Sequence, residues 1–133
     1  MGRQTDSIDR RVFETSQLMA NHPPVWGHPN KQLVFEISSP AGCTYKGQLV
    51  FSRWSPVPLP DRTESATAIR LLEGCENAYD YVPLTLTGDS VDWHVNFADP
   101  DLFVYYGSSL FAQDEMQVAE HPALGALREA LDA

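Results

Sequence analysis

The spacing of apolar residues in the first half of the chain predicts a short helix followed by two strands. Residues 7–20 carry a partial helical stripe, which predicts the helix. Residues 21–31 contain three prolines and are expected to form a loop. Residues 32–38 and 47–54 have the composition of strands, and the Pro-Ala-Gly turn at 40–42 predicts that they pair as a hairpin.

The second half is expected to alternate between helix and strand. Three prolines in residues 55–62 predict an extended connector, and residues 64–78 have the apolar spacing of a helix. Strands are expected at 79–86 and 93–98, followed by a second extended segment at 102–106.

Two helices are expected at the end of the chain. The first is predicted from about Leu110 to Glu120, with Gly107-Ser108-Ser109 as its entry and a serine as its N-cap. The second is predicted to begin at Pro122, since proline suits the first helical position, and to run to Ala133. These elements together predict an α/β fold with a mixed β-sheet flanked by helices.

The length and composition indicate one folded domain. We expect a single domain over residues 1–133, with 1–31 as an N-terminal helix and loop extension. No apolar run approaches the length of a membrane span, so no membrane partner is expected. Cys43 and Cys75 make no disulfide framework, and free thiols in a cytoplasmic protein are the expectation.

The charge of the chain disfavours nucleic acid as a partner. The net charge is −9, and Arg128 is the single base against twelve acids from residue 73 to the end. Such a surface repels phosphate backbones, so direct nucleic-acid binding is not expected. The four histidines have no ligand-like spacing to one another or to the cysteines, so neither a metal nor a cofactor is expected.

The stretch most suggestive of chemistry runs from residue 95 to residue 124. Asn96-Phe97-Ala98-Asp99 reads as a buried strand that ends in polar side chains, and Gln113-Asp114-Glu115 places two carboxylates where a helix begins. A strand end that faces a helix start is where α/β proteins build small-molecule sites. A carboxyl beside a second carboxyl can have a raised pKa, which suits proton transfer near neutrality.

This stretch resembles the signature of the poly(ADP-ribose) glycohydrolases, a branch of the macrodomain fold. Asn96-Phe97-Ala98, Gln113-Asp114-Glu115 and the later Pro122 fit the pattern in type and spacing. Phe103-Val104-Tyr105 departs from it, because the family has a triple glycine there. The resemblance covers about a quarter of the chain. It implies a macrodomain-like fold, incomplete here, so the chain is either the early part of a larger protein or a degenerate relative.

The resemblance implies roles for six residues in the hydrolysis of an O-glycosidic ribose bond. Glu115 would be the catalytic acid/base, and Asp114 would orient the ligand beside it. The substrate would be poly(ADP-ribose) or an ADP-ribosylated protein. The residues implied to contact the ligand are Asn96, Phe97, Asp99 and Gln113.

The acidic residues among these have structural alternatives. Acidic residues are common in the first turn of a helix, where they complement the helix dipole, which would explain Asp114 and Glu115. Asp99 before Pro100 also fits the start of a turn. Two other interpretations of the whole chain stay open: a non-catalytic ADP-ribose-binding or protein-interaction module with a degenerate pocket, and an unrelated α/β domain with an accidental match.

Overall fold

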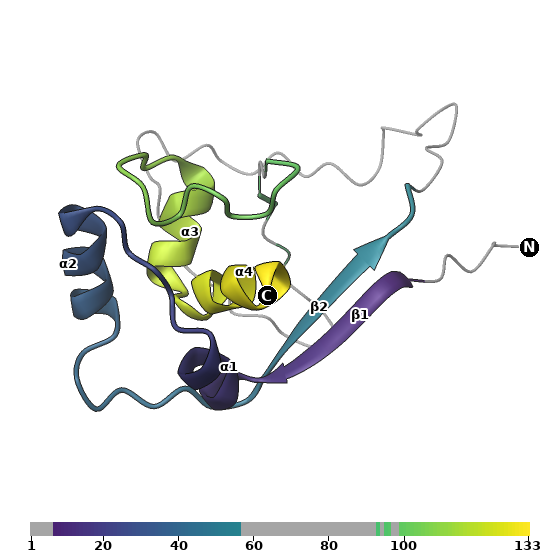
Figure 1. Cartoon of the computed structure of the whole chain (residues 1–133), viewed down its shortest axis with the longest axis horizontal. Coiled ribbons are helices and arrows are strands. Elements are labelled where there is room, and N and C mark those ends of the chain that lie inside the picture. The colour runs from purple at the N-terminus through teal and green to yellow at the C-terminus, as the bar shows by residue number, and fades with distance from the viewer. Residues whose placement is uncertain (1–6, 57–92, 94, 97–98) are drawn as a thin grey trace, which may run out of the picture. The chain divides into compact units, whose positions relative to one another are not determined.

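The described part of the chain is a small mixed α/β structure with a two-stranded antiparallel sheet and four helices (Figure 1). The computed structural model describes residues 7–56, 93, 95, 96 and 99–133. By its contacts the chain divides into two units, 1–55 with 96–133 and 56–95, and almost all described residues belong to the first. The helix expected at 64–78 and the strand expected at 79–86 lie outside the described residues.

The sheet joins β1 (Ser7–Glu14) to β2 (Gln48–Trp54), which lie side by side in Figure 1. The register places Phe13 opposite Leu49 and Val12 opposite Val50. Side chains alternate between the two faces of a sheet. Phe13 and Leu49 therefore pack against the core, while Val12 and Val50 are exposed.

The helix expected over residues 7–20 is therefore wrong in its first half. Only α1 (Thr15–Asn21) is helical, and the preceding residues form β1. Pairing with β2 satisfies the backbone groups of β1, and this distant partner overrides the partial helical stripe of the local sequence. Within the segment expected to be an extension, Leu18 of α1 lies in the core.

The strand expected at 32–38 is also wrong, because these residues belong to α2 (Pro29–Ser38). Pro29 occupies the first helical position, and the His28 side chain accepts a hydrogen bond from the backbone N–H of Asn30. Gln32 donates to Glu36 one turn later, as neighbours on a helix face do. The expected hairpin of 32–38 with 47–54 is consequently not formed.

The C-terminal helices are confirmed, with shifted starts. They are α3 (Gln113–Glu120) and α4 (Ala123–Asp132), with Pro122 as the N-cap of α4. Ser108 accepts from the N–H of Leu110 and caps a turn rather than the helix. The extended segment expected at 102–106 is a series of turns, and the described residues of the strand expected at 93–98 are not in a strand.

Two small apolar clusters form the core of the first unit. One joins α1 to α4 through Leu18, Ala126 and Leu127, with side chains of both strands packed against it. The other joins the 102–106 turns to α3 through Phe103, Tyr106 and Val118. None of the helices in the described ranges has the length and apolar character that a membrane span requires.

Candidate functional site

The first turn of α3 carries the predicted catalytic carboxylates. Ala112 is the N-cap of this helix, and its backbone N–H donates to the Oε2 of Glu115 at 2.7 Å. This contact is one half of a capping box, in which the third helical residue reaches back to the N-cap. The Glu115 side chain therefore closes the start of its own helix.

Glu115 is also removed from solvent. Its relative exposure is 1%, and its second oxygen, Oε1, is buried without a hydrogen-bond partner. Burial raises the pKa of Glu115 because it disfavours the charged form, and the neighbouring Asp114 raises it further. The N–H of Ala112 opposes this shift. A raised pKa suits an acid, but no surface of this carboxyl is open to a substrate.

Asn96 lies against α3, on a different face from Glu115. Its Nδ2 donates to the Oε1 of Gln117 at 2.7 Å, and its own Oδ1 is buried without a hydrogen-bond partner. Residues two apart on a helix do not face each other, so Gln117 and Glu115 point in different directions. Gln113 precedes Gln117 by one turn of α3. The structure therefore places Asn96 against α3, as predicted, but its side chain contacts Gln117 and not the carboxylate of Glu115.

The other predicted ligand contacts are spread out. Asp99 is exposed, and its Oδ1 accepts from the N–H of Asp101 at 3.0 Å, which is the geometry of an Asx turn. Gln113 and Asp114 are half-buried at the start of α3. Phe97 lies outside the described residues.

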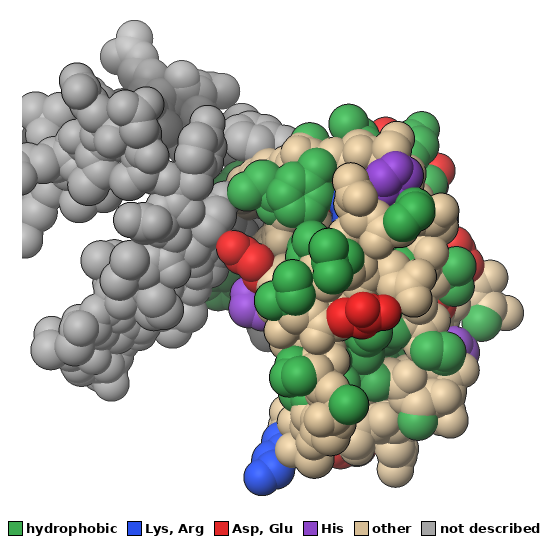
Figure 2. Space-filling view, turned by 90° about the vertical axis from the view of Figure 1, so that its left-hand side faces the viewer, with side chains coloured by type: hydrophobic (Ala, Val, Ile, Leu, Met, Phe, Trp, Pro, Cys, Tyr) green, Lys and Arg blue, Asp and Glu red, His purple; other side chains and the backbone are tan. Residues whose placement is uncertain are grey.

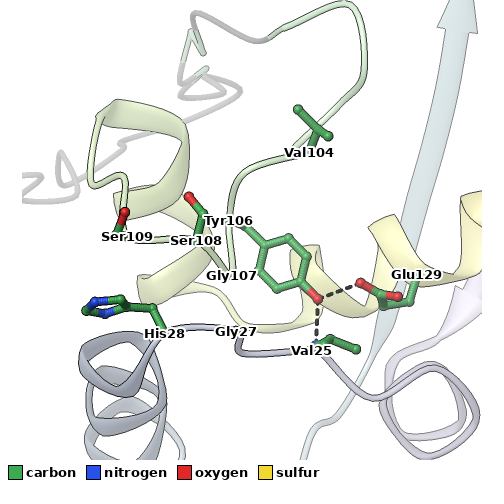
Figure 3. Close-up of a pocket in the computed structure, with 9 residues that line it drawn as sticks. All are labelled: Val25, Gly27, His28, Val104, Tyr106, Gly107, Ser108, Ser109 and Glu129. Atoms are coloured by element: carbon green, nitrogen blue, oxygen red, sulfur yellow. Dashed lines mark hydrogen bonds between the residues drawn. The ribbon is translucent and has the colours of Figure 1, made fainter.

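A cavity of about 460 Å³ opens beside the turns that follow Phe103 (Figure 3). We call it the larger cavity. In Figure 3, Tyr106 points between Val25 and Glu129, while His28 lies at the start of α2, below Ser108 and Ser109 in this view. The lining residues come from the 25–28 loop, the 104–109 turns and α4: Val25, Gly27, His28, Val104, Tyr106, Gly107, Ser108, Ser109 and Glu129.

Tyr106 organises the wall of the larger cavity. Its hydroxyl donates to the Oε1 of Glu129 and accepts from the backbone N–H of Val25, both at 2.6 Å. Burial raises the pKa of Tyr106, and the hydrogen bond to Glu129 raises it further. The phenol therefore stays protonated and acts as a fixed bridge between the 25–28 loop and α4.

Gly107 is required at this wall by close packing. A Cβ built on Gly107 would lie 2.3 Å from the carbonyl oxygen of Val25, a separation that real side chains do not adopt. The glycine thus allows the 104–109 turns to approach the 25–28 loop. Phe103, four residues before Gly107, has a φ of 59°, in the left-handed region that favours glycine. Its ring is buried in the core.

A second cavity, of about 300 Å³, lies at the start of α2, and we call it the smaller cavity. It shares His28 and Ser109 with the larger cavity. Lys31 lines it, although this lysine is only 3% exposed. Burial lowers the pKa of Lys31, while the charges of Glu115 and Asp114 oppose that shift.

Sequence reasoning missed Lys31, and it missed the role of Tyr106 as a bridge between Val25 and Glu129. Tyr106 was assigned to an extended segment, and Lys31 to the end of a loop. Pro29 was the available signal, because proline at a first helical position would have placed Lys31 in the first turn of a helix. Among the described residues, no group of three or more His, Cys, Asp or Glu side chains could hold a metal ion.

Comparisons of the chain with protein-family models, curated proteins and solved structures found no match. The described residues on their own define a small α/β structure with two adjoining cavities. The resemblance to poly(ADP-ribose) glycohydrolases remains a prediction from the sequence.

Proposed function

We propose that this chain is a non-catalytic relative of the poly(ADP-ribose) glycohydrolases that binds ADP-ribose weakly. The observation that carries the proposal is the burial of Glu115. This side chain is 1% exposed, and one of its oxygens accepts a hydrogen bond from the N–H of Ala112. A general acid must lie within hydrogen-bond reach of the substrate oxygen that it protonates. A carboxyl that closes its own helix has no such reach.

The backbone of the turns after Leu102 supports the proposal that an ancestor of this chain had a glycine-containing loop there. Phe103 stands where the family pattern has its first loop glycine, and its φ of 59° is one that glycine adopts without strain. A bulky residue at this φ is uncommon. The backbone conformation thus fits a glycine loop, while the ring of Phe103 fills the core beside Val118 instead of leaving space for a diphosphate.

The larger cavity is the proposed binding site, since the turns that replace the glycine loop form one of its walls. Its volume of about 460 Å³ is in the usual range of small-molecule sites. No lysine or arginine is among its lining residues, and Glu129 adds a negative charge. We therefore expect weak affinity for a diphosphate, with a dissociation constant of roughly 1 mM.

Calorimetry with ADP-ribose and a hydrolysis assay with poly(ADP-ribose) test the two halves of the proposal. Val104→Trp should fill the larger cavity and abolish binding, whereas Val50→Trp, on the exposed face of the sheet, should leave it unchanged. Release of ADP-ribose from the polymer would contradict the non-catalytic half. Equal binding by both variants would contradict the assignment of the cavity.

An active glycohydrolase is the second candidate, and the raised pKa of Glu115 favours it. If turnover is found, Glu115→Gln should lower it by about 10²–10⁴-fold, because the amide cannot exchange a proton with the substrate. Asp114→Asn should lower it less, since its proposed role is orientation. Equal small effects of both changes would remove Glu115 from the catalytic role.

A further inference from the structure

Lys31 is a buried cation at the unfavourable end of a helix. It is the third residue of α2, and the N-terminal end of a helix carries partial positive charge. Its relative exposure is 3%, so water does not compensate for this placement. Nothing in the folding of α2 itself calls for a lysine at this position.

The partners of the Lys31 ammonium do not neutralise it. Nζ donates to the backbone oxygen of Tyr106 at 2.9 Å and lies 4.9 Å from the centre of the Phe111 ring. Among the described residues, ion pairs join Arg11 to Asp9 and Arg128 to Asp132, and neither involves Lys31. The nearby carboxylate of Glu115 does not form one either: its Oε2 accepts from Ala112, and its Oε1 has no hydrogen-bond partner. Glu115 and Asp114 therefore act on Lys31 only from a distance, and no described carboxylate forms an ion pair with it.

A buried charge without a direct ion pair is unfavourable, and a bound anion would stabilise it. The smaller cavity offers room for an anion. Its polar lining is Lys31, His28, Asn30 and Ser109, and its apolar lining is Val34 and Phe111. His28 accepts from the N–H of Asn30 through Nδ1, which leaves Nε2 as the donor of the neutral ring.

We propose that the smaller cavity binds a small organic carboxylate, with its oxygens at the Lys31 ammonium and its hydrocarbon body against Val34 and Phe111. The volume of about 300 Å³ suits a ligand with a few carbon atoms. This site does not depend on the proposed binding of ADP-ribose, although the two cavities share His28 and Ser109.

The charges around Lys31 favour a monoanion over a phosphate dianion. Asp114 and Glu115 lie close enough to act on the charge of Lys31, and the chain has a net charge of −9. One negative charge on the ligand matches the single ammonium, whereas a second would face these two carboxylates. The apolar lining also favours an alkyl carboxylate over an inorganic anion.

Butyrate and butyramide are the probes that test this proposal on the full chain. The chain has two lysines, the buried Lys31 and the exposed Lys46, so ¹⁵N spectra of lysine side chains give two signals. Saturating butyrate should shift the Nζ signal of Lys31 and leave that of Lys46 unchanged. This measurement uses the unmodified protein, so it does not depend on whether a variant folds.

Variants and a neutral analogue give the controls. Lys31→Met should weaken butyrate binding by at least about tenfold, since it removes a charge-assisted hydrogen bond, while Lys46→Met should not change it. Butyramide has the same shape without the charge and should bind at least about tenfold more weakly than butyrate. No saturable shift of the Lys31 signal with butyrate would overturn the proposal. Equal binding of butyramide, or tighter binding of inorganic phosphate, would also overturn it.

Discussion

The starts of α2 and α3 carry a buried, ionisable side chain at the same helical position with opposite charge. Lys31 is the third residue of α2, and Glu115 is the third residue of α3. Both are nearly inaccessible to solvent, at 3% and 1%. The two helices pack against each other, and the charge of Glu115 acts on Lys31.

The helix itself explains one of these side chains and not the other. A glutamate at this position complements the helix dipole and closes the first turn, and Glu115 does so through the N–H of Ala112. A lysine there opposes the dipole, and Lys31 makes its hydrogen bond outside its own helix, to Tyr106. The sequence motif drew attention to Glu115, yet the physical anomaly is Lys31.

The strongest test of this comparison is Glu115→Ala. We expect a loss of about 2 kcal/mol in the free energy of unfolding, because the N–H of Ala112 loses its acceptor and a small void forms. Asp114→Ala is the matched control and should lose less than about 1 kcal/mol. Urea unfolding measures both, and equal losses would show that Glu115 has no special structural role.

Tyr106→Phe should have the next largest effect, a loss of about 1–2 kcal/mol. The substitution removes the hydroxyl that bridges Val25 and Glu129 but keeps the backbone oxygen that Lys31 uses. The loss therefore measures the bridge alone. An unchanged unfolding midpoint in urea would mean that water replaces the bridge without penalty.

Lys31→Met should have the opposite sign, with a gain of about 1 kcal/mol in stability when no ligand is bound. Replacing the buried charge with an apolar side chain of similar length removes its desolvation penalty, which we expect to exceed the cost of leaving the backbone oxygen of Tyr106 without a donor. Lys46→Met, at an exposed position, should change the unfolding free energy by less than about 0.5 kcal/mol. A large loss in the first variant would show that Lys31 stabilises the fold by itself.

The pH dependence of stability should show the same contrast as a smaller effect. The pKa of Glu115 is raised from 4.5 by burial, so the folded state holds more protons and stability falls as pH rises above 4.5. The pKa of Lys31 is lowered from 10.5, so the folded state holds fewer protons and stability rises as pH approaches 10.5. Urea unfolding at a series of pH values measures both trends. The fall in stability above pH 4.5 should be absent in Glu115→Gln, and the rise toward pH 10.5 should be absent in Lys31→Met.

Local patterns in the sequence predicted the elements whose signals are local. The apolar spacing and Pro122 located α3 and α4, and the strand composition of residues 47–54 located β2. The assignment of β1 failed because its pairing partner lies more than thirty residues away along the chain. Such non-local pairing leaves little mark on the strand's own sequence.

The error at residues 32–38 affected the site as well as the fold. Leu33, Val34, Phe35 and Ile37 have strand propensity, but Pro29 and the His28 cap start a helix there. With a strand in place of α2, Lys31 had no helical position and no reason to be buried. The burial of Lys31 also depends on Tyr106 and Phe111, which are distant in sequence.

The exposed side chains of α2 and the loop before α3 leave this side of the molecule partly apolar. Leu33, Ile37, Leu110 and Phe111 are each at least half exposed, and apolar side chains are visible on the face drawn in Figure 2. Single exposed apolar residues need no functional explanation. Phe111 is the one of these four that lines the smaller cavity, where it would contact the hydrocarbon body of a bound carboxylate.

The contrast between the two lysines has a practical consequence for chemical conjugation. Lys31 is buried and its ammonium is hydrogen-bonded to Tyr106, so Lys46 is the exposed one of the two lysine side chains. Lys46 lies in the loop between α2 and β2 and lines neither cavity. A dye or a solid support attached through this side chain would therefore leave both cavities open.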